Sequence, residues 1–125
     1  MLQSLHVKNL ALIDEAEVNF EKGLNILSGE TGAGKSILLG SMQLILGGRS
    51  AKDMIRTGAS SALVELLFQV ENPRAEASLR ELGVETSEGQ VLLTRKLMDG
   101  RSINKINGET CTVAQMKAAA SSVRV

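Results

Sequence analysis

One stretch decides the fold of this chain, Gly29-Glu30-Thr31-Gly32-Ala33-Gly34-Lys35-Ser36. It fits the phosphate-loop pattern G-x-x-x-x-G-K-[ST] without a gap. Glycines let the backbone turn tightly enough for successive N–H groups to point at one anion, and the N-terminus of a following helix adds positive potential there. We therefore predict a nucleoside-triphosphate site in which Lys35 neutralises the β- and γ-phosphates and Ser36 ligates Mg²⁺.

The residues on either side have the order that such a loop requires, with a strand before it and a helix after it. Residues 24–28 form a short, mostly apolar run that predicts a buried strand. From residue 35 to 46 apolar side chains recur at three- and four-residue spacing, and Gly47-Gly48 is a helix stop signal. These patterns predict an α/β fold in which the helix packs against a mixed sheet.

The composition limits the class of protein. The chain has 125 residues, of which 43% are hydrophobic, and this suffices for one core without any apolar run of membrane-spanning length. Residues 1–6 lack the basic segment and apolar core of a signal peptide, and the single Cys111 cannot form an internal disulfide. These features predict a cytoplasmic protein with no membrane partner.

The charges are balanced over the whole chain but not locally. Fourteen Lys and Arg residues match fourteen Asp and Glu residues. Residues 95–125, however, hold six basic residues against Asp99 and Glu109. This excess could face a phosphate backbone, or it could be the solvated surface of a hairpin, since no aromatic side chain lies among the charges.

The remaining sequence predicts strands and one peripheral hairpin. Alternating apolar residues indicate half-exposed strands at residues 4–8, 16–21 and 64–70. Residues 91–97 and 101–106 flank Asp99-Gly100, a favoured tight-turn pair, and Asn107-Gly108 offers a second turn.

Capping signals predict two short helices in the same half of the chain. Asn72 is suited to cap a helix with Pro73 in its first turn, and Gly83 is suited to end it. Thr112 and Gln115 have the spacing of a capping box for a helix that runs towards Ser122.

A phosphate-loop ATPase also needs an Asp after an apolar strand to hold Mg²⁺, often followed by a Glu that polarises water. Leu10-Ala11-Leu12-Ile13-Asp14-Glu15 imitates this pattern. It lies just before the phosphate loop, between two strands expected to be antiparallel, whereas a neighbouring parallel strand requires a crossover. We therefore interpret Asp14 and Glu15 as part of a strand connection. Asp53 and Asp99 follow no apolar run, so neither is expected to be that acidic site. Residues 121–125 carry no stop signal for the last predicted helix, and we therefore expect this chain to be the front piece of a longer protein.

Several segments resemble the RecN family of bacterial DNA-repair proteins, relatives of the SMC chromosome-maintenance ATPases. The first is Val-Lys-Asn-Leu-Ala-Leu-Ile-Asp at residues 7–14, and the second runs from residue 20 through the phosphate loop to residue 36. Residues 46–59, 100–102 and 106–108 extend the resemblance over nearly the whole chain. Asn104-Lys105 departs from it, because a small residue and an aromatic are expected there, and this puts a local contact of the hairpin in question.

The resemblance implies an ABC-type, SMC-like P-loop ATPase head that binds ATP and Mg²⁺ and is split in sequence. Residues 1–125 would be its N-terminal lobe. The signature motif, the Mg²⁺-binding Asp and the catalytic Glu would lie in a C-terminal lobe beyond a long coiled coil, so the piece alone is expected to be inactive. The glutamine that senses the γ-phosphate would follow residue 125, and Gln90, which precedes a strand pattern, is not expected to replace it.

The resemblance further implies partners. Two heads would clamp ATP between them as a head-to-head homodimer, and the C-terminal lobe of the same protein would complete each head. Nucleotide state would be coupled to the engagement of DNA ends or single strands in double-strand break repair and recombination. The protein would then be cytoplasmic and nucleoid-associated.

Residue roles follow from the same resemblance. The nucleotide-binding residues would be Gly29, Glu30, Thr31, Gly32, Ala33, Gly34, Lys35 and Ser36, with Lys35 catalytic and Ser36 the metal ligand. Arg56 stands where SMC-type heads place an arginine near the phosphates or DNA, with a solvated loop arginine as the alternative.

Four other polar residues are assigned from the local pattern. Lys8 and Asn9 could approach the base or ribose, although a polar strand end is the simpler interpretation. His6 has no Cys or His at metal-ligand spacing, so we expect an exposed strand residue. Cys111 has no neighbour in sequence that would lower its pKa.

Two other functions fit a phosphate loop. One is the nucleotide-binding subunit of an ABC transporter, which would carry a signature motif and an Asp after an apolar strand within one short domain. The other is a small P-loop phosphotransferase such as a nucleotide kinase, which would carry a substrate-binding lid. Long heptad repeats after residue 125 would support the DNA-repair ATPase instead.

Overall fold

The described part of the computed structural model comprises residues 2–10, 13–19, 25–26, 55–86, 88–98 and 101–123. The phosphate loop and the helix predicted over residues 35–46 lie outside these ranges. The elements, in chain order, are β1 (Leu2–Leu10), β2 (Ile13–Asn19), β3 (Asn25–Ile26), β4 (Ser61–Gln69), α2 (Pro73–Glu81), β5 (Gln90–Met98), β6 (Arg101–Ile106), β7 (Glu109–Cys111) and α3 (Val113–Val123).

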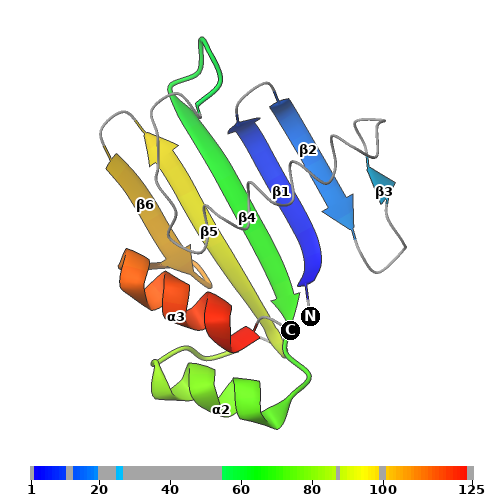
Figure 1. Ribbon diagram of the computed structural model, residues 1–125, viewed down its shortest axis with the longest axis vertical. Coiled ribbons are helices and arrows are strands. Elements are labelled where there is room, and N and C mark those ends of the chain that lie inside the picture. The colour runs from blue at the N-terminus through cyan, green and yellow to red at the C-terminus, as the bar shows by residue number, and fades with distance from the viewer. Residues whose placement is uncertain are drawn as a thin grey trace.

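The strands form one seven-stranded sheet in the order β3-β2-β1-β4-β5-β6-β7 (Figure 1). Each of its described pairs is antiparallel. The antiparallel arrangement predicted for β1 and β2 is therefore confirmed, as is the β5–β6 hairpin. The strand predicted over residues 24–28 is present at Asn25–Ile26, where it pairs with β2 at one edge of the described sheet.

Side chains alternate strictly between a core face and an outer face. In β4 the even-numbered residues are buried and the odd-numbered ones are half-buried. The cross-strand partners of those even residues are buried as well, because directly opposite residues share a face of the sheet. The core face carries most of the buried apolar side chains: Leu5, Val7, Ala16, Ala62, Val64, Leu66, Phe68, Val91, Leu93, Leu97 and Ile106.

Helices α2 and α3 lie side by side at one end of the sheet, and the turn before β4 lies at the other end (Figure 1). Both predicted caps are confirmed. The Asn72 Oδ1 atom accepts a 2.9 Å hydrogen bond from the Arg74 N–H at the start of α2. Thr112 and Gln115 exchange hydrogen bonds of 2.9 and 3.1 Å, the reciprocal pattern of a capping box. Among the described residues, no helix is long and apolar enough to cross a membrane.

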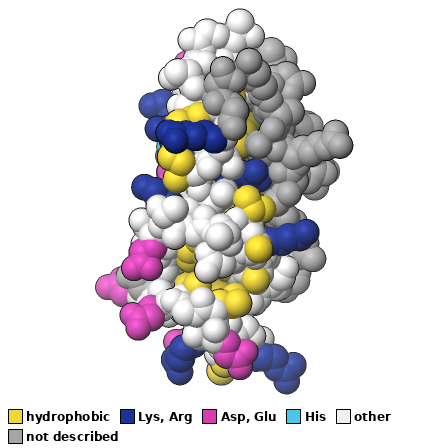
Figure 2. Space-filling model, turned by 90° about the vertical axis from the view of Figure 1, so that its left-hand side faces the viewer, with side chains coloured by type: hydrophobic (Ala, Val, Ile, Leu, Met, Phe, Trp, Pro, Cys, Tyr) yellow, Lys and Arg dark blue, Asp and Glu magenta, His cyan; other side chains and the backbone are white. Residues whose placement is uncertain are grey.

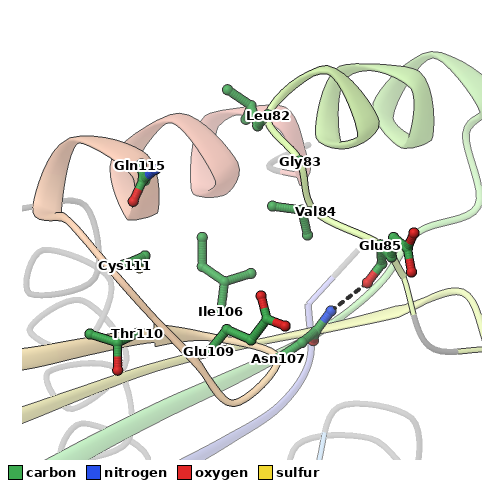
Figure 3. A pocket seen from close by; sticks show the side chains of 10 residues that line it. All are labelled: Leu82, Gly83, Val84, Glu85, Ile106, Asn107, Glu109, Thr110, Cys111 and Gln115. Carbon is green, nitrogen blue, oxygen red and sulfur yellow. Dashed lines mark hydrogen bonds between the residues drawn. The ribbon is translucent and has the colours of Figure 1, made fainter.

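Asn107 ties the second turn to two other segments. Its backbone has φ 51° and Gly108 has φ 86°, the left-handed pair that a tight hairpin turn requires. The Asn107 Oδ1 atom accepts a 2.8 Å bond from the Leu92 N–H, and its Nδ2 donates one of 2.8 Å to the Glu85 carbonyl (Figure 3). Asn107 therefore holds the connection after α2 against the start of β5.

Two polar residues lie on the core face of the hairpin. Arg95 is 4% exposed and faces Asn104, which is 6% exposed, across the β5–β6 pair. The prediction that Arg95 belongs to a solvated or DNA-facing surface is therefore wrong, because the strand alternation turns it inward. Of the two residues that depart from the family pattern, Asn104 is buried beside Arg95 at the place where a small side chain was expected, and Lys105 is exposed at the place where an aromatic one was expected.

Candidate functional site

One corner of the sheet brings together Asn9, Asp14 and Arg56, and we call it the Arg56 corner. It lies where β1 ends, β2 begins and the chain enters β4 (Figure 1). The Arg56 N–H donates a 2.8 Å hydrogen bond to the Asn9 carbonyl, and Ile55 forms a bridge with Leu10. The segment before β4 is therefore attached to the end of the β1–β2 hairpin.

The segment itself is a tight turn. The Ala59 N–H donates a 2.9 Å bond to the Arg56 carbonyl, and Gly58 has φ 91°, in the left-handed region that glycine adopts without strain. The Arg56 backbone is thus fixed on both sides. Its side chain is 45% exposed, and Nη1 lies 3.5 Å from Oδ1 of Asp14, whose side chain is 78% exposed.

Among the predicted nucleotide-binding residues, Arg56 is the one that the structure describes. Residues 29–36, including Lys35 and Ser36, lie outside the described ranges. Asn9 takes part in the corner through its carbonyl group, and its φ of 54° makes the end of β1 irregular. Lys8 is exposed on β1. The approach of Lys8 and Asn9 to a base or ribose therefore stays a prediction.

The acidic residues that imitate a metal-binding strand have other neighbours. Asp14 and Glu15 lie within β2, so the connection from β1 is shorter than predicted. Asp14 pairs with Arg56, and Glu15 pairs with His6. Since β1 and β2 are antiparallel, the reason for excluding these acids as the second acidic site holds. Gln90 opens β5 and its Nε2 donates a 2.9 Å bond to Gln3 Oε1, which gives it a structural partner.

His6 is bonded at both ring nitrogens, contrary to the expectation of a simple exposed residue. Its Nε2 lies 2.7 Å from Glu15 Oε2, and its Nδ1 lies 3.1 Å from Glu65 Oε1. Glu17 stands directly opposite His6 on β2. The two bonded carboxylates lie at opposite edges of the ring, so they do not converge on one ion, and the described residues contain no group suited to hold a metal.

This environment shifts two pKa values in opposite directions. Burial acts to lower the pKa of His6, but the hydrogen bonds and charges of Glu15 and Glu65 outweigh it and raise that pKa above its ordinary value. The hydrogen bond from His6 lowers the pKa of Glu15. Because only the imidazolium donates from both nitrogens, the charged ring suits both carboxylates. From the sequence, strand alternation could have predicted that His6, Glu15 and Glu65 share one face of the sheet. The pairing of His6 with the two carboxylates could not have been predicted without the register of the strands.

A hollow of about 550 Å³ lies between the two helices and the β6–β7 hairpin (Figure 3). Val84, Ile106 and Cys111 contribute to its lining, with the carboxylates of Glu85 and Glu109 beside them. Burial raises the pKa of the Cys111 thiol, which agrees with the expectation from sequence that no neighbour lowers it. The hollow is at the helical end of the sheet, opposite the Arg56 corner.

Basic side chains gather on the outer face of the hairpin. Lys96, Arg101 and Lys105 are exposed and share the face opposite the core, as the register of β5 against β6 requires. Figure 2, which views the molecule from the β6 side, shows Lys and Arg side chains in its upper part and again at its lower end, with several acidic side chains in its lower half. No described carboxylate forms an ion pair with these three residues.

Comparison with known proteins supplies the family. Residues 4–122 match the family described as the AAA domain. The chain is 37% identical over 119 residues to DNA repair protein RecN of Bacillus subtilis, and 40% identical over 119 residues to RecN of Halalkalibacterium halodurans. Each alignment covers 94% of this chain and 21% of the relative. The resemblance to RecN is thereby confirmed, and the chain spans about a fifth of the length of these relatives.

Solved structures support the same fold. The chain superposes with a TM-score of 0.70 and 25% identity on a protein from a study of ATP-driven dimerization and DNA-stimulated activation of SMC ATPases, covering 98% of this chain and 78% of that one. An Smc head bound to the C-winged helix domain of ScpA gives a TM-score of 0.68 at 23% identity, covering 99% and 41%. The recombination mediator protein RecF, in a structure described as RecF-ATPrS, gives a TM-score of 0.61 at 17% identity. The superposition covers 93% of this chain and 29% of the RecF chain. The predicted SMC-type P-loop ATPase fold is confirmed.

We predict that the imidazolium of His6 persists above the ordinary titration range of histidine. Since His6 is the one histidine of the chain, its ring signals can be followed by NMR across pH without assignment ambiguity. Glu15→Gln should move the pKa of His6 down, because it removes the charge that holds the proton, while Glu85→Gln, far along the chain at the helical end, should leave it unchanged. A His6 pKa below about 6.5 in the unsubstituted chain would contradict the interpretation.

The same shift has a consequence for stability. A raised histidine pKa stabilises the fold fully below the pKa of the unfolded chain, and this contribution is lost as pH rises through the folded-state pKa. The lowered pKa of Glu15 matters at acidic pH. Its contribution to the free energy of unfolding is lost as pH falls through that pKa. We therefore expect the His6→Gln variant to have a lower free energy of unfolding than the parent, with the largest difference at about pH 6. At alkaline pH the free energies of unfolding of the two proteins should become equal.

Proposed function

Because this chain belongs to the AAA domain family, we propose that it is the ATP-binding N-terminal lobe of a split, SMC-like ATPase head that acts in DNA double-strand break repair and recombination. The observation that carries the proposal is the complete phosphate-loop pattern at residues 29–36, within a chain that matches RecN over 94% of its length. Similarity to RecN, SMC and RecF proteins favours this function over an ABC transporter subunit or a small phosphotransferase.

Each part of the site has a chemical role in this proposal. The backbone N–H groups of residues 29–34 would surround the phosphates, Lys35 would place a compact charge at the terminal ones, and Ser36 would hold Mg²⁺. The exposed guanidinium of Arg56, on a turn fixed by the end of β1, fits an additional donor to an anion. When bound, ATP with Mg²⁺ supplies the transferable phosphoryl group.

The proposed partners follow from the same assignment. The C-terminal lobe of the same protein would supply the acidic residues for metal and water, and a second head would close over the nucleotide in a head-to-head homodimer. DNA would be engaged as ends or single strands, in the cytoplasm at the nucleoid. These statements rest on the family and on the names of the relatives, which include RecN and a DNA-stimulated SMC ATPase.

Lys35→Ala in the full-length protein should weaken ATP binding or abolish turnover while leaving the fold intact, because Lys35 would supply the compact charge at the terminal phosphates. A fluorescent ATP analogue measures the affinity, and phosphate release measures the turnover. Lys117→Ala is the matched control, since Lys117 is an exposed lysine on α3. Unchanged binding and unchanged hydrolysis in Lys35→Ala would exclude the phosphate-loop assignment.

The 125-residue chain alone should hydrolyse no significant ATP at saturating Mg²⁺ and ATP. A phosphate loop positions the γ-phosphate, but rate enhancement also needs metal-holding and water-orienting groups. The C-terminal lobe, added in trans, should restore turnover. Robust hydrolysis by the chain alone, lost in Asp14→Asn or Glu15→Gln, would show that these acids complete the site.

We propose further that the basic outer face of the β5–β6 hairpin contacts DNA phosphates. Lys96, Arg101 and Lys105 are exposed there on one face, without a described acidic partner. Replacing Lys96 and Lys105 together by alanine in the full-length protein should weaken DNA binding equally for different sequences. The slope of log affinity against log salt concentration should fall by about 2, because each lysine that neutralises a phosphate accounts for about one unit of that slope.

The control for this prediction removes two basic residues from the opposite end. Arg74 and Arg80 are exposed on α2. Their double alanine variant should keep the DNA affinity and the salt dependence of the parent. An equal weakening of DNA binding in both double variants would indicate a response to overall charge instead of a defined surface.

A further inference from the structure

The β6–β7 hairpin leaves one edge of the described sheet open beside the hollow at the helical end. Glu109, Thr110 and Cys111 make up β7, the last strand in the sheet order, and all three line the hollow. The described strands pair with β7 on its β6 side alone. An edge strand presents N–H and C=O groups with which a further extended segment can pair.

The pairing pattern shows which backbone groups lie at this edge. The Asn107-Gly108 turn makes the residues that flank it a hydrogen-bonded pair. The backbone groups of Glu109 therefore point towards β6, and those of Thr110 point away from it. In the same phase, the Thr112 N–H is turned away from β6 and donates a 2.9 Å bond to Gln115 Oε1. Thr110 thus presents one backbone donor and one backbone acceptor at the edge.

The hollow beside this edge combines apolar surface with charge of one sign. The side chains of Val84, Ile106 and Cys111 contribute the apolar part of its lining. Its charged residues, Glu85 and Glu109, are both acidic, and no described lysine or arginine lines it. The volume of about 550 Å³ lies within the range of sites that hold ligands. These features suit an occupant that carries an apolar side chain close to a basic one.

Strand geometry determines the spacing of those two side chains. Glu109 and Cys111 have their side chains on the core face, because their opposite residues on β6 are buried there. Figure 3 shows the Thr110 side chain pointing away from the hollow. A segment paired antiparallel with β7 would place one residue opposite Thr110, the preceding one opposite Cys111 and the following one opposite Glu109. The matching sequence is therefore an apolar residue, any residue, and then a lysine or arginine.

We infer that the edge of β7 and the adjoining hollow bind an extended segment of a separate protein with this apolar–any–basic pattern. Complementary charge affects the rate and the selectivity of encounter more than the affinity, and both matter for a partner that arrives by diffusion. The exposed side chain of Leu82, which also lines the hollow, would be covered by the bound segment. None of these residues belongs to the proposed nucleotide site or to the basic face of the β5–β6 hairpin, so binding here is independent of both.

The test uses the full-length protein and the fluorescein-labelled peptide Ser-Thr-Leu-Thr-Lys-Thr-Ser, with binding followed by fluorescence anisotropy. The same peptide with glutamate in place of lysine should bind roughly fivefold more weakly, because it brings a like charge to Glu109. Replacing Glu85 and Glu109 together by glutamine should weaken binding of the lysine peptide by roughly fivefold, the loss expected for exposed ion pairs. The double variant Glu71→Gln with Glu81→Gln removes two exposed carboxylates outside the hollow and should keep the parent affinity.

Thr110→Pro tests the strand pairing itself. It removes the outward N–H and spares the bonds between β6 and β7, because proline is tolerated at the edge of a sheet. Affinity for the lysine peptide should fall by roughly tenfold, the effect of losing one backbone hydrogen bond. Thr110→Ala keeps the N–H and should bind the peptide like the parent. If the thermal midpoint of Thr110→Pro falls by more than about 5 °C, the glutamine double variant at the hollow decides the question.

Three other results would overturn the inference. Equal binding of the lysine and glutamate peptides, or unchanged affinity in a folded Thr110→Pro variant, would exclude a charge-matched added strand. Absence of binding by the full-length protein would mean that a segment of the same chain covers the hollow. Self-association that is lost when Glu85 and Glu109 are replaced by glutamine would assign the hollow to a second copy of the protein.

Discussion

The pairing register of β4 with β1 and β5 is the constraint on which the rest of the structure depends. Four even-numbered residues of β4 point into the core, and their opposite neighbours do the same: Ala62, Val64, Leu66 and Phe68. A shift of one residue would move this whole set to the outer face and expose large apolar side chains to water. Hydrophobic burial therefore selects one register, and that register determines the neighbours of every polar residue on the three central strands.

The outer face is a product of the same register. It carries His6 between Glu15 and Glu65 on the β1 side, and Lys96 and Lys105 on the hairpin side. The described acidic residues of this face thus gather on the β1 side, where Lys8 lies opposite Glu15, although the chain as a whole is neutral. The acidic side is partly neutralised by the imidazolium. The basic side has no described acidic partner, which is the arrangement suited to an external polyanion.

The two ends of the sheet differ in how their loops are held. At the helical end, Asn107 fixes the connection after α2 through two side-chain hydrogen bonds. At the opposite end, backbone contacts hold the turn that carries Arg56, and its side chain stays accessible beside Asp14. A fixed backbone with an accessible charged side chain leaves that charge open to solvent, whereas the helical end has the contacts of a structural support.

By itself the sequence determined the features that depend on residues close together in the chain. The phosphate loop is one continuous motif, the capping box joins Thr112 to Gln115, and the hairpins follow turn residues with a fixed backbone preference. The resemblance to RecN added an expected role for Arg56 near the phosphates or DNA, which stays a prediction. Only the tertiary structure decided that Arg95 is buried and that Asp14 lies beside Arg56. The physical reason is that strand order and register choose the partners of a side chain across long separations in sequence, and neither quantity is contained in any local pattern.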